Sequence, residues 1–175
     1  MAEILTAPEM VRTLRRKLRE REAASPPLRT VFTNGAFDLL HVGHLRYLRT
    51  ARALGDLLIV GLNSDQSVRT YKDPRRPLVP EGERAELLAA LDCVDYVVIF
   101  GETTASKLIE MLRPTIYVKG GDYAVEAGRE GKPLPELAAV AGYGGEVRIV
   151  PLVAGRSTSQ IVQTILARYG SEAAS

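Results

Sequence analysis

A continuous apolar segment at residues 57–62, Leu-Leu-Ile-Val-Gly-Leu, most constrains the fold of this chain. It carries no polar side chain in either alternating set of positions. A strand of this kind is buried on both faces, as in a parallel sheet covered by helices. We therefore expect it to lie inside a parallel sheet.

Four more segments of strand character alternate with segments of helical character. The expected strands are residues 29–33, 57–62, 94–100, 115–118 and 146–150, and the expected helices are residues 43–54, 80–91, 104–112, 135–141 and 157–169. Five such units in series predict an α/β fold with a single open five-stranded parallel sheet and helices on both faces.

The N-terminal segment has a different pattern. Residues 9–24 place apolar side chains at helical spacing with charged residues opposite, Pro8 suits a first turn, and Ser25-Pro26-Pro27 ends the segment. We expect an N-terminal helix on the outside of the domain. The chain is therefore divided into a helix and linker (1–27), one α/β domain (28–170) and a tail (171–175).

Composition narrows the class of protein. A chain of 175 residues with 46% apolar and 25% charged residues is typical of one globular domain. The net charge of +2 comes without a basic stripe, so we expect no nucleic-acid partner. No apolar run reaches the ~18 residues of a membrane span, and no secretory signal is evident. With one cysteine, Cys93, the chain fits a reducing cytoplasm.

The only two histidines, His41 and His44, lie where the first expected strand gives way to a helix. Their spacing of three places both rings on one side of a helical turn, and a helix start attracts phosphate. We expect a nucleotide phosphate site with two imidazole donors. A zinc site would need more ligands of Cys, His or carboxylate type, and Cys93 is remote in sequence. A structural role is the other alternative.

Three further polar segments also follow expected strands: Asn63-Ser64-Asp65, residues 119–122 and residues 156–159. Ligands of open α/β sheets bind at the carboxyl ends of strands. Ordinary helix capping would also account for the first and the last of these segments. Lys72 lies in a loop with three prolines, where we expect Arg75 and Arg76 to form a solvated cluster. The chain lacks both the GxxxxGK[ST] and the GxGxxG phosphate motifs.

Residues 34–44, Asn-Gly-Ala-Phe-Asp-Leu-Leu-His-Val-Gly-His, resemble the HxGH signature of the cytidylyltransferase-like nucleotidyltransferases. Segments at 61–65, 84–88, 118–123 and 155–159 follow in the order of that family. The resemblance covers about residues 29–169 and is strongest to its heptose-1-phosphate adenylyltransferase branch, the adenylyl-transferring half of bifunctional heptose kinase/adenylyltransferases. Ala36, where that branch commonly has Cys, and residues 124–133 depart from the pattern.

The resemblance implies a Rossmann-like nucleotidyltransferase fold and transfer of AMP from ATP to D-glycero-β-D-manno-heptose 1-phosphate. The products are ADP-heptose, a lipopolysaccharide precursor, and pyrophosphate. It implies Mg²⁺ held by ATP phosphates, with Asp122 as a candidate ligand, together with a homodimer and a sugar kinase on a separate chain. Two alternatives stay open. One is transfer to another acceptor, such as CTP with glycerol 3-phosphate or ATP with flavin mononucleotide, and the other is a non-catalytic nucleotide-binding domain.

The resemblance also assigns roles to residues. His41, His44 and Lys72 are the expected catalytic residues. The expected nucleotide and phosphate contacts are Asn34, Gly35, Ala36, Phe37, Arg84, Lys119, Gly120, Arg156, Ser157, Thr158 and Ser159. The expected acceptor contacts are Asp38, Asn63, Asp65, Gly121 and Asp122. For Arg84, a surface pair with Glu81 or Glu83 is an equal alternative.

Overall fold

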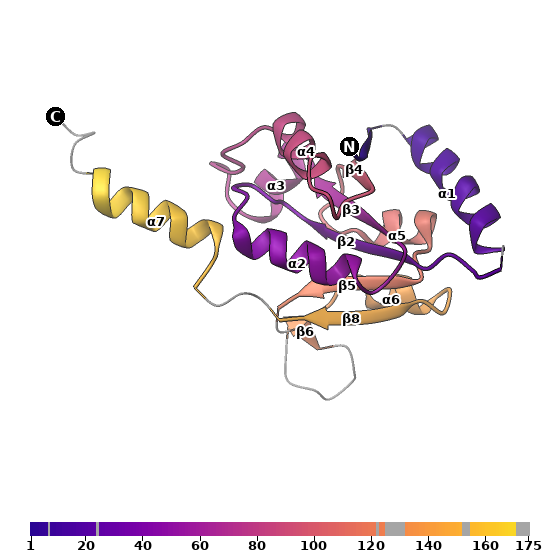
Figure 1. Ribbon diagram of the computed structural model, residues 1–175. Helices are drawn as coiled ribbons and strands as arrows, with labels where there is room; N and C mark the ends of the chain where they lie inside the picture. The colour runs from indigo at the N-terminus through magenta and orange to yellow at the C-terminus, as the bar shows by residue number, and fades with distance from the viewer. Residues whose placement is uncertain (7, 24, 122, 125–131, 152–154, 171–175) are drawn as a thin grey trace.

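The computed structural model describes residues 1–6, 8–23, 25–121, 123–124, 132–151 and 155–170. Its centre is a parallel sheet of six strands in the order β1–β4–β3–β2–β5–β8 (Figure 1). The strands of this sheet are β1 (Glu3–Leu5), β2 (Thr30–Gly35), β3 (Leu57–Asn63), β4 (Tyr96–Phe100), β5 (Ile116–Gly120) and β8 (Glu146–Val150). A separate pair consists of β6 (Tyr123–Ala124) and β7 (Lys132–Pro133).

The α/β class and the parallel sheet are confirmed, but the expected number of strands was wrong. The additional strand is β1, which pairs with β4 from Glu3 opposite Tyr96 to Leu5 opposite Val98. Three residues are too few to show the continuous or alternating apolar pattern that reveals a strand in a sequence. β1 is therefore recognised only through the neighbour that it meets.

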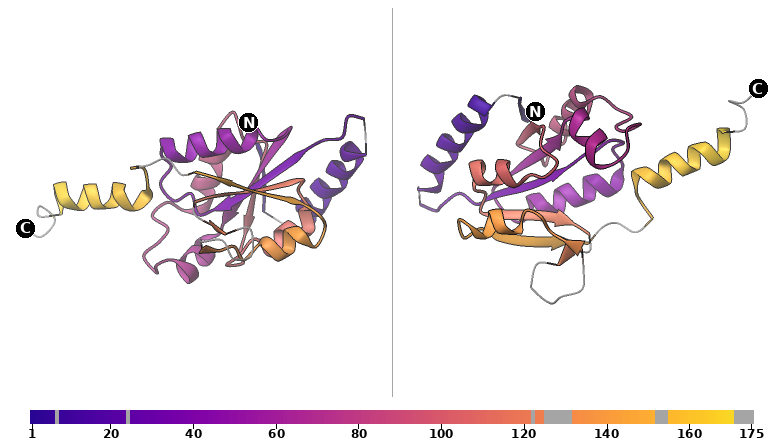
Figure 2. Two further views of the ribbon diagram at one scale, coloured as in Figure 1. Left: turned by 90° about the horizontal axis from the view of Figure 1, so that it is seen from below. Right: turned by 180° about the vertical axis from the view of Figure 1, so that it is seen from behind.

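Helices cover both faces of the sheet, as expected (Figure 2). They are α1 (Pro8–Glu22), α2 (Val42–Arg52), α3 (Asp65–Tyr71), α4 (Glu81–Ala89), α5 (Ser106–Leu112), α6 (Leu137–Ala141) and α7 (Thr158–Tyr169). Side chains of α1, α5 and α6 form one apolar core on one face, and side chains of α2 and α4 form a second core on the other. β3 is buried along its whole length, because it contributes to both cores.

The order of the strands places a switch point between β2 and β5. The chain runs outward from β2 through β3 to β4 and then returns to add β5 on the other side of β2. A crevice forms at the carboxyl ends of the strands where the direction reverses, and ligands bind there in sheets of this type. Asn34 at the end of β2 and Lys119 near the end of β5 meet there, because Lys119 Nζ donates to Asn34 Oδ1 at 3.0 Å.

α7 differs from the other long helices because none of its residues is buried. It projects from the body of the protein (Figure 1). Three of its apolar side chains, Ile165, Leu166 and Tyr169, are exposed by 49%, 63% and 60%. Within the ranges given above, no helix combines the length and the apolar character needed to cross a membrane.

Candidate functional site

A pocket of about 310 Å³ opens at the switch point between β2 and β5. The starts of α2 and α7 form its walls. Most of the predicted site residues line it, from the β2–α2 turn, α2, the end of α3, the end of β5 and the start of α7. They are Asn34, Gly35, Ala36, Phe37, Asp38, His41, His44, Lys72, Lys119, Gly120, Arg156, Ser157, Thr158 and Ser159. Segments separated by more than a hundred residues thus converge on one site.

His41 caps the start of α2. The Gly43 N–H donates to His41 Nδ1 at 3.1 Å, so in the neutral ring the proton lies on Nε2, which becomes a hydrogen-bond donor. A Cβ at Gly43 would lie 2.8 Å from Nδ1, closer than the two atoms can approach. The glycine between the histidines is therefore needed for this cap.

The His44 ring is enclosed by its neighbours. It stacks on the ring of His41, with centroids 3.9 Å apart and an interplanar angle of 19°, and the Phe37 ring meets it edge-on at 5.3 Å. Burial, together with smaller effects of the nearby charges of His41 and Lys72, lowers the pKa of His44 to about 4. Burial also lowers the pKa of His41, with a smaller effect from Arg156. Both rings are therefore neutral near pH 7 and stack without repulsion.

Lysines lie on two sides of the pocket. Lys72 ends α3 as its C-cap, and Lys119 comes from β5. Burial lowers the pKa of each lysine. At Lys72 the charge of Asp38 opposes this effect, and at Lys119 that of Glu136 does so. Desolvated ammonium groups interact strongly with anions, which suits a site for several phosphates.

The start of α7 lines the pocket beside the start of α2. Ser157 is the N-cap, and its Oγ accepts a hydrogen bond from the Gln160 N–H at 3.2 Å. Gly155, with φ of +69°, precedes Arg156 and allows the turn into the helix. Two helix starts thus face one pocket, together with a guanidinium and the hydroxyls of Ser157, Thr158 and Ser159.

Asp38 lines the pocket, but its carboxylate is already engaged by the protein. It accepts hydrogen bonds from the Leu78 and Val79 N–H groups at 2.7 and 3.1 Å and from Arg76 Nη1 at 2.7 Å. These three donors use the carboxylate to hold the loop after Lys72, and the acceptor contact expected of Asp38 stays a prediction. Arg76 is likewise not part of a solvated cluster, whereas Arg75 is exposed and pairs with Asp73.

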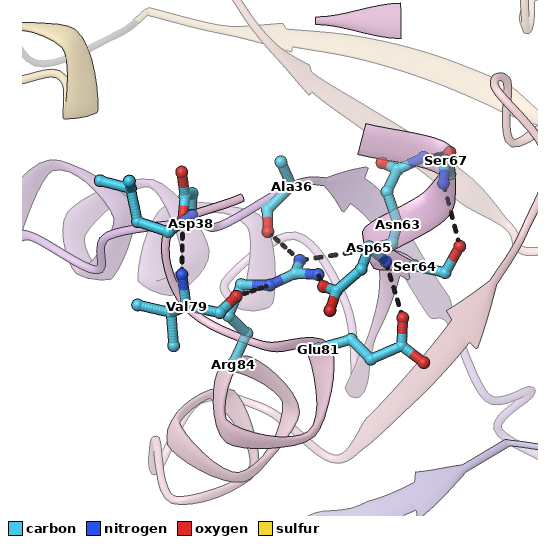
Figure 3. Close-up of polar contacts among 10 residues, drawn as sticks. Ala36, Asp38, Asn63, Ser64, Asp65, Ser67, Val79, Glu81 and Arg84 are labelled. Carbon is cyan, nitrogen blue, oxygen red and sulfur yellow. Dashed lines mark hydrogen bonds and ion pairs between the residues drawn. The ribbon is translucent and has the colours of Figure 1, made fainter. Parts of the chain in front are cut away.

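Arg84, Asn63 and Asp65 lie outside the pocket, in a buried polar network (Figure 3). Arg84 is fully buried and pairs with Asp65 at 2.7 Å, so the expected phosphate contact is wrong and neither surface pair forms. The Asn63 side chain donates to Ser67 Oγ at 3.0 Å. The acceptor contact expected of Asn63 is corrected, because this side chain is buried in the network. The contact expected of Asp65 stays a prediction, because its side chain is 22% exposed.

Two other expected acceptor residues follow β5. Gly121, with φ of +127°, does not line the pocket, and its N–H donates to the Val150 oxygen at 3.2 Å. Asp122 lies outside the described residues, as does most of the segment 124–133.

Tyr47 was missed by the sequence analysis. It lines the pocket, and its hydroxyl donates to the Val118 oxygen at 3.1 Å and lies 2.6 Å from Thr33 Oγ1. Its position three residues after His44, on the same face of α2, was the available signal. Through these hydrogen bonds it connects α2 to β2 and β5, one helical turn after His44.

The comparisons with known proteins agree with this geometry. The family model described as cytidylyltransferase-like matches residues 32–164, which contain both walls of the pocket. This chain belongs to the cytidylyltransferase-like family.

Curated relatives are also similar to the chain. It is 56% identical over 146 residues to "Bifunctional protein HldE" of Geobacter sulfurreducens, which covers 82% of this chain and 28% of the relative. The protein of the same name from Koribacter versatilis is 48% identical over 93% of this chain and 31% of the relative. The chain therefore spans less than a third of the length of these relatives.

A solved structure shares the fold. It is described as the lipopolysaccharide core biosynthesis protein from Thermoplasma volcanium, with a TM-score of 0.56 and 26% sequence identity. The match covers 72% of this chain and 97% of that protein.

The side chains that line the pocket can be compared with the oxygen ligands that Mg²⁺ prefers. Among the described residues, no group of three or more His, Cys, Asp or Glu side chains is arranged to hold a metal ion. Asp38, the one carboxylate among the described residues of the lining, already accepts three hydrogen bonds from the protein. The site fits a Mg²⁺ ion that is held chiefly by substrate phosphates, as is common for this metal.

Proposed function

We propose that this protein transfers AMP from ATP to D-glycero-β-D-manno-heptose 1-phosphate and releases pyrophosphate. The observation that carries the proposal is the neutral, stacked pair of His41 and His44 at a helix start, with Lys72 in the same pocket. The family supports nucleotidyl transfer. The relatives named HldE support the sugar phosphate as acceptor.

The proposed reaction is an in-line attack by a phosphate oxygen of the sugar phosphate on the α-phosphorus of ATP. The new P–O bond forms as the bond from the α-phosphorus to the bridging oxygen breaks, and that oxygen leaves with pyrophosphate. No covalent protein intermediate is needed. Two anions must meet, so catalysis consists mainly of positioning and of stabilising the developing charge.

Each group has a place in this scheme. The Nε2 proton of His41, and a donor of His44, hydrogen-bond the α- and β-phosphates and do so more strongly as charge develops. Lys72 neutralises the α-phosphate and the incoming phosphate. Ser157, Thr158 and the start of α7 hold the leaving pyrophosphate. Mg²⁺, when bound, neutralises phosphate charge.

The surroundings of the reaction are proposed on the resemblance alone. We propose that a sugar kinase supplies the 1-phosphate, that the reaction takes place in the cytoplasm, and that the protein is a homodimer. Light scattering of the purified protein tests the last point, and a monomeric mass contradicts it.

The test of the function is pyrophosphate release with ATP or CTP against three acceptors: heptose 1-phosphate, glycerol 3-phosphate and flavin mononucleotide. We expect release with ATP and heptose 1-phosphate. Release with another pair would replace the proposed substrates but keep the reaction type. No release from any pair would favour a non-catalytic nucleotide-binding domain.

A further inference from the structure

The Arg84 guanidinium donates four hydrogen bonds, which lead to the turn after β2, to the junction of β3 and α3, and to the loop before α4 (Figure 3). Nε donates to the Val79 oxygen at 2.8 Å, and Nη1 donates to the Asn63 oxygen at 3.0 Å and to the Ala36 oxygen. Nη2 donates to Asp65 Oδ1 at 2.7 Å. A fully buried cation is costly unless it is paired and hydrogen-bonded, so this arrangement is held firmly.

The hydrogen bond to the Ala36 oxygen connects Arg84 to His44 through Phe37. Ala36 precedes Phe37, which has φ of +44°, a conformation that is uncommon for a bulky side chain. The hydrogen bond from Arg84 holds the Ala36 end of this strained turn, and the carboxylate of Asp38 holds the other end. The Phe37 ring, fixed in this way, packs edge-on against His44.

The ion pair with Asp65 connects Arg84 to Lys72 through helix α3. Asp65, which receives Arg84 Nη2, is the first residue of α3, and Lys72 is the C-cap of that helix. The Asp65 N–H donates to Glu81 Oε2 at 2.6 Å, so α4 holds the start of α3 twice. Because α3 is a short rigid element, fixing its start fixes the position of Lys72.

We propose that Arg84 is a positioning residue that sets the placement of Lys72 relative to His41 and His44. It does so by tying the Phe37 turn, the end of β3 and the start of α3 to one buried guanidinium. The proposal rests on the proposed function, in which these three side chains contact the reacting phosphates. It replaces direct phosphate binding as the reason for an arginine at this position.

The test is Arg84→Lys, which keeps the charge but cannot span four acceptors. We expect kcat to fall by about 10²-fold, because small misplacements in an active site have effects of this size. The KM for ATP should change little, since Arg84 does not reach the pocket. Thermal melting verifies that the variant is folded.

Histidine NMR provides a readout that needs no substrate. The chain has two histidines, so two ring signals report on the pair. In Arg84→Lys a looser turn admits water, and the pKa of His44 rises from about 4 toward 6.5. The charged neighbours that act on His44, His41 and Lys72, stay present in the variant.

A matched control is Arg52→Lys. Arg52 Nη1 donates to the Gly55 oxygen at 2.6 Å, and Nε pairs with Asp95 at 3.2 Å, at the opposite end of the sheet from the pocket. This substitution also loses guanidinium contacts to a carbonyl and a carboxylate. We expect wild-type kcat and a wild-type titration of His44.

Asp65→Asn separates the two contacts. It removes the charge that holds α3 but leaves the hydrogen bond to Ala36, so we expect kcat to fall by about tenfold. The pKa of His44 should rise less than in Arg84→Lys, because its burial is kept and only the smaller effect of the Lys72 charge changes. If Arg84→Lys does not fold, this variant decides, and wild-type kcat in it overturns the proposal. So does a folded Arg84→Lys protein with wild-type kcat and wild-type His44 titration. If no substrate pair reacts, the proposed function fails, and the comparison of histidine titrations in Arg84→Lys and Arg52→Lys still decides the positioning.

Discussion

The two helix starts that face the pocket have similar local chemistry and very different support. α2 begins at a capping side chain, His41, and buries Gly43, Tyr47, Leu48 and Ala51 in the body of the domain. α7 begins at the capping hydroxyl of Ser157 and buries no residue. The difference shows that hydrogen-bonding geometry at a helix start and the anchoring of that helix are separate properties of a site.

This contrast divides the binding of a triphosphate into two parts. The α2 wall is held by the core before any ligand arrives. α7 buries no residue, and a helix of 12 residues with so little packing is marginally stable in water. We therefore expect the binding of a ligand on the α7 side to depend on how well this helix is held in place.

The largest expected effect compares two leucines. Leu48→Ala on α2 should lower the free energy of unfolding by about 2–5 kcal/mol, because the side chain is fully buried. Leu166→Ala on α7 should change it by less than about 0.5 kcal/mol, because that side chain is exposed. Urea denaturation measures both, and equal losses would contradict the contrast.

The next effect concerns turnover on the α2 wall. We expect His44→Ala to reduce kcat about 10²- to 10³-fold, as for the loss of one donor that stabilises developing charge. Pyrophosphate release measures it, and circular dichroism verifies the fold. A folded variant with near-normal turnover would remove His44 from the proposed mechanism.

An intermediate effect is the dependence of stability on pH. The pKa of His44 is about 4 in the folded protein and about 6.5 when unfolded, so the unfolded state binds more protons between these values. Stability should therefore fall as the pH drops through this window. His44→Ala should reduce the dependence but not abolish it, because burial also lowers the pKa of His41. Leu166→Ala should leave it unchanged. Denaturation midpoints at several pH values test both variants.

The smallest effect concerns the cap of α7. Ser157→Ala removes a hydrogen bond worth about 1 kcal/mol to the helix, which corresponds to about fivefold weaker binding of a ligand that needs α7 folded. The melting temperature should not change. Calorimetric titration with ATP measures the affinity, and a lower melting temperature would mean that α7 is part of the cooperative unit.

The sequence predicted most of the elements because their signals are local. The apolar segment 57–62 became β3, and the strand 146–150 was placed at both ends correctly. The pocket followed from parallel topology, since polar segments after strands meet at one edge. β1 was missed because its three residues are too few to show a strand pattern.

The errors at the site concern side chains whose role is set by burial. Arg84 and Asn63 were expected at ligands, and each is polar and near a strand end or helix start. Whether such a group faces a ligand or the interior depends on which carbonyls and carboxylates the fold brings around it. The spacing of residues in the sequence does not show that Arg84 is surrounded by acceptors from residues 36, 63, 65 and 79.

The two edges of the main sheet bear on self-association. An open strand edge can pair with another chain and seed aggregation. β4 is covered by β1, a strand of only three residues, which leaves little edge to extend. At the other edge, β8 carries Glu146 and Arg148, whose side chains form an ion pair. A short strand on one side and charged side chains on the other thus limit growth of the sheet between molecules.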